Sequence, residues 1–162
     1  MSIADRFIAR MTRRPADFVI GGSERPYLRR WFVLPRNPVF NVYLHQFLRS
    51  DDDRALHDHP WLFNASLLLR GSYVEHTIKA GGIEMRTLRQ AGAFKLRCGP
   101  APHRVELLGD PFAEVENPLP CWTLFITGPR VRQWGFHCPH GWVHWKQFTA
   151  ANDPGAVGRG CE

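Results

Sequence analysis

Two histidines separated by one residue, His57 and His59, form a pattern that could do chemistry. In an extended strand, residues i and i+2 point to the same face, so both imidazole rings can reach one metal ion. Imidazole nitrogen suits zinc, iron, copper and nickel, and two such ligands leave positions for a third ligand and for a substrate. A solvated turn before a strand would explain the same pair, so its meaning depends on the surrounding residues.

The residues around this pair resemble the cupin family. The first cupin motif contains two histidines separated by one residue, usually a glutamate a few positions later, and then a glycine. The second contains a glycine, a proline-rich turn and a third histidine. This chain matches those positions in the right order over about residues 41 to 128, with His57, His59, Asn64 and Gly71 in the first motif and Gly92 and His103 in the second. Asn64 stands where the family usually has glutamate.

The resemblance implies an all-β fold, the double-stranded β-helix or jelly-roll barrel of the cupins. In such a barrel, inward positions on different strands project into one cavity, so His57, His59 and His103 could bind one metal ion. A three-histidine site without a carboxylate is similar to that of cupins of the thiol dioxygenase type. This implies a divalent metal, with iron(II) as the first choice and manganese, nickel or zinc as alternatives, and no other cofactor.

Asn64 leaves three possibilities for the rest of the metal site. Its amide oxygen could be a weak, uncharged fourth ligand, or water could fill the positions that the histidines leave. Glu75 could instead supply the missing charge, because Tyr73, Glu75 and Thr77 share one face of a strand that, by the resemblance, looks into the barrel. The other interpretation of Glu75, which the sequence favours, is a solvated strand residue.

Basic and aromatic residues near the motifs are candidates for orienting a substrate. The net charge of +6 comes mostly from arginines spread along the chain, and this spread argues against nucleic-acid binding. Arg97 and Tyr73 could hold a carboxylate or phosphate. His45 alternates with Tyr43 and Phe47 and could lie near the cavity or be an ordinary core histidine. We therefore expect a small polar or anionic substrate or ligand.

Short runs rich in branched aliphatic and aromatic residues predict β-strands. The predicted strands are 31–34, 41–48, 62–69, 72–79, 83–89, 93–97, 104–108 and 122–127. Turns at 50–53, 81–82 and 109–111 separate some of them, and this even punctuation is typical of a β-sandwich or barrel. Before them, apolar residues at helical spacing predict a short N-terminal helix over residues 3–13, capped by Ser2 and packed on the barrel.

We expect a single domain over residues 1–162, because a chain of 162 residues can bury one substantial core. Its parts are a helix with a lead-in strand, the barrel core, an aromatic C-terminal flap and a mobile tail, at 1–35, 41–128, 129–149 and 150–162. The sequence lacks a secretory signal and a membrane-spanning run, so we expect a cytoplasmic protein without membrane partners. Exposed strand edges and the flap favour a homodimer.

The C-terminal flap contains further potential metal ligands, His137, Cys138, His140 and His144. Their spacing fits no zinc module, and the aromatic residues between Trp134 and Trp145 favour a hydrophobic flap or dimer contact over a second site. The cysteines Cys98, Cys121, Cys138 and Cys161 lack paired C-x-x-C spacing. We interpret all four as free thiols, the first two half-buried beside strands, although the sequence does not exclude a disulfide.

Three functions are compatible with these features. The first is a mononuclear metal-dependent oxygenase, such as a non-heme iron dioxygenase, in which three histidines hold the metal. The second is a non-catalytic barrel that binds a small ligand. The third is a metal-independent sugar-nucleotide epimerase or isomerase that uses His57 or His59 with Glu75 as base and acid. The sequence leaves open whether the protein is an enzyme.

Overall fold

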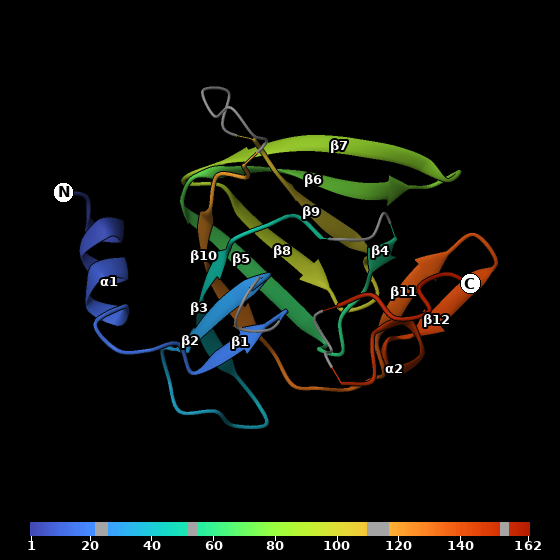
Figure 1. The fold of residues 1–162 in the computed structure, drawn as a ribbon, viewed down its shortest axis with the longest axis horizontal. Helices are drawn as coiled ribbons and strands as arrows, with labels where there is room; N and C mark the ends of the chain where they lie inside the picture. The colour runs from blue at the N-terminus through green and yellow to red at the C-terminus, as the bar shows by residue number, and fades with distance from the viewer. Residues whose placement is uncertain (22–25, 52–54, 110–116, 153–155) are drawn as a thin grey trace.

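The fold consists of two antiparallel β-sheets that face each other across a barrel interior (Figure 1). The computed structural model describes residues 1–21, 26–51, 55–109, 117–152 and 156–162. The first sheet contains, in spatial order, β1 (Phe18–Ile20), β2 (Leu28–Phe32), β3 (Asn41–Phe47), β10 (Cys121–Thr127), β5 (Phe63–Arg70) and β8 (Phe94–Cys98). The second contains β12 (Gly141–His144), β11 (Gly135–Cys138), β4 (Leu56–His57), β9 (His103–Leu107), β6 (Ser72–Lys79) and β7 (Ile83–Gln90). The described helices are α1 (Ile3–Met11) and α2 (Trp145–Phe148).

The predicted all-β fold is confirmed, and every strand predicted between residues 41 and 127 is present, as β3 and β5 to β10. The strand predicted at 31–34 begins earlier, as β2 at Leu28. The sequence did not predict β1, β4, β11 and β12, because these strands are four residues long or shorter and carry little alternation. The predicted turn at 81–82 joins β6 to β7, whereas the turns at 50–53 and 109–111 lie partly outside the described residues.

Alternating burial along β10 and the glycine between β5 and β6 help explain how the chain forms two facing sheets. In β10 every second residue is buried, which places Thr123 and Phe125 on the inner face. Gly71 lies between β5 of the first sheet and β6 of the second and has a φ of +84°. A Cβ atom there would lie 2.9 Å from the carbonyl oxygen of Pro120. Both the positive φ and this close approach require glycine, which lets the chain cross between the sheets.

The N-terminal helix packs on the outer face of the first sheet, as predicted. It begins at a capping box, in which the Ser2 hydroxyl accepts from the Asp5 N–H and the Asp5 carboxylate accepts from the Ser2 N–H. Its buried residue Ile8 contacts Trp31 and Leu44. The helix ends at Met11, two residues before the predicted end.

An apolar cluster fills the barrel on the side of the β5–β6 turn. Its buried members come from four strands of both sheets and are Leu68, Tyr73, Val105, Leu107 and Cys121. Burial of such side chains stabilises each by about 1.5–3 kcal/mol relative to exposure. This cluster ties the two sheets together at one end and leaves the opposite part of the interior for a cavity.

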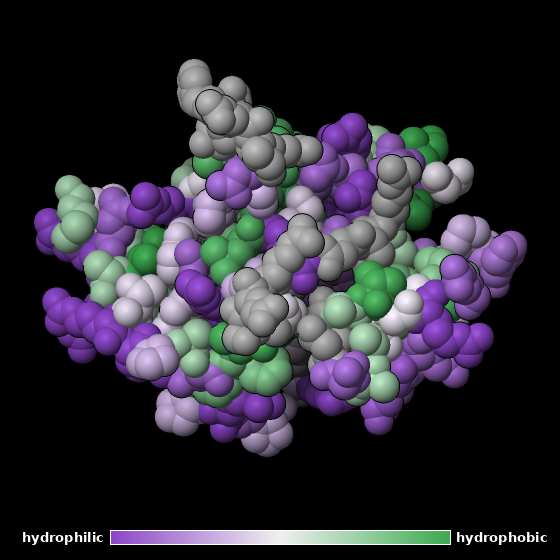
Figure 2. Space-filling model, viewed as in Figure 1, coloured by the Kyte–Doolittle hydropathy of each residue, from purple (hydrophilic) through white to green (hydrophobic). Residues whose placement is uncertain are grey.

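The surface is mostly polar, but apolar residues gather around β1 in the central part of the face in Figure 2. Phe18 and Val19 of β1 are exposed and also line the cavity. On the edge strand β8, Phe94 and Leu96 are exposed as well. The homodimer stays a prediction. Among the described residues, no helix is long and apolar enough to cross a membrane.

The flap predicted at 129–149 is the β11–β12 hairpin followed by α2. It joins the second sheet because β11 pairs with β4, with Phe136 opposite His57. Phe136 also stacks on Phe148 of α2, with ring centroids 3.7 Å apart. The flap is therefore an integral part of the second sheet, next to the first histidine motif.

The interpretation of all four cysteines as free thiols is wrong for Cys138 and Cys161, which form a disulfide. The tail folds back onto α2, where the N–H groups of Gly158 and Gly160 both donate to the Phe148 carbonyl. No local sequence motif predicts this arrangement. Cys98 is exposed and Cys121 is buried, so neither is half-buried as expected. These bonds anchor the described part of the predicted mobile tail; its mobility stays a prediction, and residues 153–155 lie outside the described residues.

Thiol titration should distinguish the cysteines. The native protein is expected to react at Cys98 alone, because burial raises the pKa of Cys121 to about 12 and the thiolate is the reactive form. Unfolding without reductant should expose two thiols, and reduction should expose all four. Four thiols in the unfolded, unreduced protein would contradict the disulfide. Disulfides are rare in the reducing cytosol, so a disulfide in protein isolated from cells would also argue against the predicted cytoplasmic location.

Candidate metal centre

Three histidine side chains, His57, His59 and His103, meet inside the barrel and are called the triad below. His57 ends β4, His59 follows two residues later, and His103 begins β9. Their ligand nitrogens all lie within 4.8 Å of one another, and Nε2 of His59 is 2.9 Å from Nε2 of His103. Two nitrogens that bind one ion at about 2.0–2.1 Å are about 3 Å apart, so this donor set fits a single metal ion. Within the described residues, it is the one group of histidine, cysteine and acidic side chains that converges in this way.

Strand pairing and a glycine position these histidines. β4 pairs with β9 at a single step, in which His57 lies opposite His103. The backbone N–H of His59 donates to the Gly99 carbonyl at 2.9 Å, which holds the residue after β4 against the end of β8. A Cβ atom on Gly99 would lie 2.0 Å from the carbonyl oxygen of Trp61. Only glycine permits this approach.

Carboxylates face the far sides of two of these imidazoles. Oδ2 of Asp51 is 3.9 Å from Nδ1 of His57, and Oε1 of Glu75 is 3.8 Å from Nδ1 of His103. Metal-binding histidines commonly turn their second nitrogen toward a carboxylate, which fixes the ring and raises its basicity. Here the carboxylates lie on the Nδ1 side and leave Nε2 for an ion.

The interior keeps all three imidazoles neutral. Burial lowers the pKa of His57, His59 and His103 below the usual range, and the positive charge of Arg97 lowers them further. Asp51 partly opposes this effect at His57. A metal ion binds the unprotonated imidazole, so a site with low histidine pKa values needs no proton release near neutral pH.

Asn64 lies in the barrel wall on β5, completely buried. Neither atom of its amide group has a hydrogen-bond partner among the described residues. It faces Arg97 in the neighbouring strand and does not belong to the cavity lining. Buried amides are normally paired, so this position is unusual, but coordination by Asn64 stays a prediction.

Glu75 corrects the sequence interpretation. It is fully buried instead of solvated, and it forms ion pairs with Arg97 and with Arg89, the latter at 2.8 Å. Burial alone would raise the pKa of Glu75, but the two arginines outweigh burial and lower it. Glu75 therefore stays ionised beside His103, in a cluster with two arginines.

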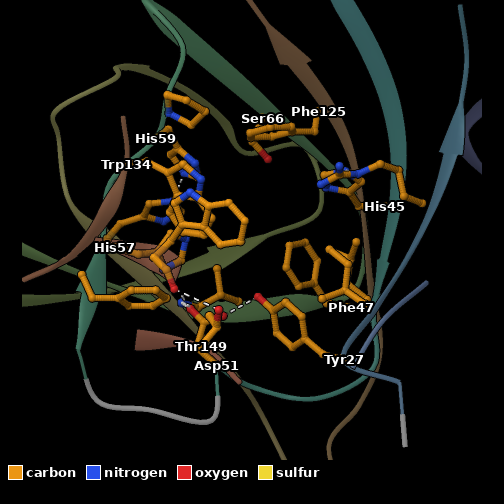
Figure 3. Close-up of a pocket in the computed structure, with 18 of the residues that line it drawn as sticks. Tyr27, His45, Phe47, Asp51, His57, His59, Ser66, Phe125, Trp134 and Thr149 are labelled. Atoms are coloured by element: carbon orange, nitrogen blue, oxygen red, sulfur yellow. Dashed lines mark hydrogen bonds and ion pairs between the residues drawn. The ribbon is translucent and has the colours of Figure 1, made fainter. Parts of the chain in front are cut away.

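A cavity of about 440 Å³ opens beside the three histidines. Figure 3 shows His57 and His59 on one side of it, His45 and Phe47 on the opposite side, and Tyr27 at the lower edge. The volume is that of a pocket for a small molecule. The predicted substrate-orienting residues Tyr73, Arg97 and His45 all line it.

Asp58, between the two motif histidines, is a functional residue that the sequence analysis missed. Its carboxylate accepts hydrogen bonds from the Gly135 N–H at 2.9 Å and from the Trp142 indole at 3.1 Å, and it pairs with Arg132 at 2.9 Å. Its own N–H donates to the Gly135 carbonyl. Asp58 thus fastens the β11–β12 hairpin to the strand that carries His57. The sequence signal for this role was the carboxylate between the two histidines. In a strand, the side chain at the intervening position points to the face opposite the histidines and can therefore contact another element.

The structure does not bring the C-terminal histidines and cysteine together. Nε2 of His137 lies 3.4 Å from Asp58, and Nε2 of His144 lies 3.2 Å from the Gln133 side chain. Cys138 forms the disulfide with Cys161 and has no free thiol. His137, His144 and Cys138 therefore make contacts within and around the β11–β12 hairpin.

Comparison with known proteins supports the fold. No protein-family model matches the sequence, and no curated protein matches it. Among solved structures, an uncharacterized conserved protein with a double-stranded β-helix domain from Klebsiella pneumoniae is 14% identical, with a TM-score of 0.50 over 84% of this chain and 95% of that chain. Oxalate decarboxylase from Bacillus subtilis is 17% identical, with a TM-score of 0.52 over 78% of this chain. The match spans only 31% of the decarboxylase chain.

These matches agree with the two six-stranded sheets. At such low identity they establish the architecture and leave the chemistry to the site itself. The protein therefore has a double-stranded β-helix fold, as the resemblance described above implied.

Proposed function

We propose that the protein is a mononuclear metal-dependent oxygenase, with iron(II) as the first candidate, that acts on a small polar or anionic molecule. The observation that carries this proposal is the convergence of three neutral imidazoles at the wall of a 440 Å³ cavity. Imidazole ligands suit iron, nickel and zinc. Manganese(II) centres are named for the Bacillus subtilis oxalate decarboxylase, which supports a metal in a barrel of this kind.

A bound redox-active ion would supply Lewis acidity and electrons for oxygen chemistry. The residues around it would bind the substrate and exclude water. The ring of Phe125 lies 6.0 Å from that of His59, and the ring of Trp134 lies 6.3 Å from that of His57, so aromatic groups surround the triad. Burial raises the pKa of Tyr73, which keeps its phenol protonated and able to donate a hydrogen bond to a substrate anion.

The epimerase alternative receives less support from the contacts of Glu75. Its carboxylate is occupied by Arg97 and Arg89 and lies beside His103 instead of His57 or His59. A carboxylate held in two ion pairs is a poor proton donor. The remaining alternative is the non-catalytic binding barrel. It would bind a small ligand in the same cavity without converting it to a product.

Elemental analysis followed by oxygen-electrode measurements tests the proposal. We expect about one metal ion per chain in protein purified without a histidine tag. After loading with iron(II), we expect oxygen uptake that depends on a small carboxylate substrate. Metal without oxygen uptake, together with a ligand-dependent rise in melting temperature, would favour the binding barrel. Failure to bind any of the four candidate metals on reconstitution would contradict the metalloenzyme.

A further inference from the structure

Arg30 places an unpaired positive charge in the cavity wall, across from the triad. It lies on β2 and is the register partner of His45 on β3. Its Nε donates to Nε2 of His45 at 2.8 Å, and its guanidinium carbon lies 4.8 Å from the centre of the Tyr43 ring. No carboxylate pairs with it in the part of the chain that the structure describes, and it lines the cavity.

Two other charged residues that line the cavity, Arg97 and Asp51, have protein partners, and Arg130 lines it as well. Arg97 pairs with Glu75, and Asp51 accepts from the Val105 N–H and the Tyr27 hydroxyl. Arg30 is half-buried, and a charge partly withdrawn from water without a counter-ion is generally compensated by an opposite charge. Burial lowers the pKa of Arg30 to about 10, so its charge persists at neutral pH. Its two terminal nitrogens can form the forked pair that a carboxylate accepts.

The space between Arg30 and the triad is apolar. The ring of Phe125 lies 5.1 Å from that of His45 and 6.0 Å from that of His59, so it separates the arginine from the metal ligands. Phe47 and Trp134 contribute further aromatic surface to the same cavity, on opposite sides in Figure 3. A ligand that reaches from Arg30 to the triad must therefore cover aromatic rings with its middle part.

We propose that Arg30 is the anion-binding residue of this cavity and that its ligand is a monocarboxylate with an apolar or aromatic body. The carboxylate pairs with Arg30, and the opposite end of the molecule points to the three histidines. This assignment rests on the proposed function in so far as the same cavity holds the substrate, and it names that substrate's class. Recognition by Arg30 does not require a bound metal.

Calorimetric titration with a matched pair of probes tests the assignment. 3-Phenylpropionate should bind about tenfold or more tightly than 3-phenylpropionamide, because the amide keeps the shape but lacks the charge. Arg30→Met should reduce this ratio to about one, and Arg30→Lys should leave an intermediate ratio. Arg29→Met is the matched control, since Arg29 is the exposed neighbour on the same strand and should keep the wild-type ratio.

The same pair is then titrated into His103→Ala, which separates this assignment from the metal proposal. A preserved ratio there supports Arg30 as the anion site, whatever the metal content of the protein. Equal binding of acid and amide to the wild type would overturn the assignment, as would an unchanged ratio in a folded Arg30→Met chain. Absence of binding by both probes would overturn it too.

Discussion

His103→Ala is expected to lower the bound metal from about one ion per chain to below about a tenth of that amount. Removing one of three converging ligands leaves the two-histidine remnant His57 and His59, which holds a divalent ion far more weakly. The measurement is elemental analysis of wild type and variant after identical reconstitution and desalting. Circular dichroism of both proteins checks that the barrel is still folded.

His140→Ala is the matched control for this change. His140 is exposed in the β11–β12 hairpin and lies outside the group of converging ligands. The variant should retain the wild-type metal content. Equal loss in both variants would refute the assignment of the site, and loss in His140→Ala alone would move the site to the C-terminal hairpin.

Glu75→Gln is expected to lower the free energy of unfolding by about 3–5 kcal/mol. The substitution keeps the volume of the side chain but leaves Arg97, which is 4% exposed, and Arg89 without their shared counter-ion. Removing one partner of a buried ion pair strongly lowers the free energy of unfolding, because the other charge stays buried without a counter-ion. Urea unfolding followed by tryptophan fluorescence measures the change.

The comparison for Glu75→Gln is Glu84→Gln on the adjacent strand β7. The Glu84 side chain is 60% exposed, although it contacts His76, so solvent can replace its partner. We expect a much smaller loss of stability than for Glu75→Gln. Similar losses in the two variants would mean that the buried ion pairs contribute no more than a surface contact.

Local residue patterns determined much of this structure. The strands between 41 and 127 are short runs rich in branched aliphatic and aromatic residues, so their existence could be predicted. The glycine at 71 and the His57 and His59 pair are visible within short segments, whereas His103 lies 44 residues after His59 and was matched through the family resemblance. Fold class and candidate ligands therefore followed from the sequence.

Only the tertiary structure decided which polar groups became buried and what they contacted. The solvated interpretation of Glu75 was wrong because Arg89 and Arg97 come from two other strands, one in each sheet. The disulfide depends on the return of the tail to Phe148. Asp58 and Arg30 acquired their roles from partners in the C-terminal hairpin and in β3. Burial and pairing of charges depend on strand order and register. These arise from contacts between distant segments, so a local sequence pattern does not predict which charged side chains become buried or paired.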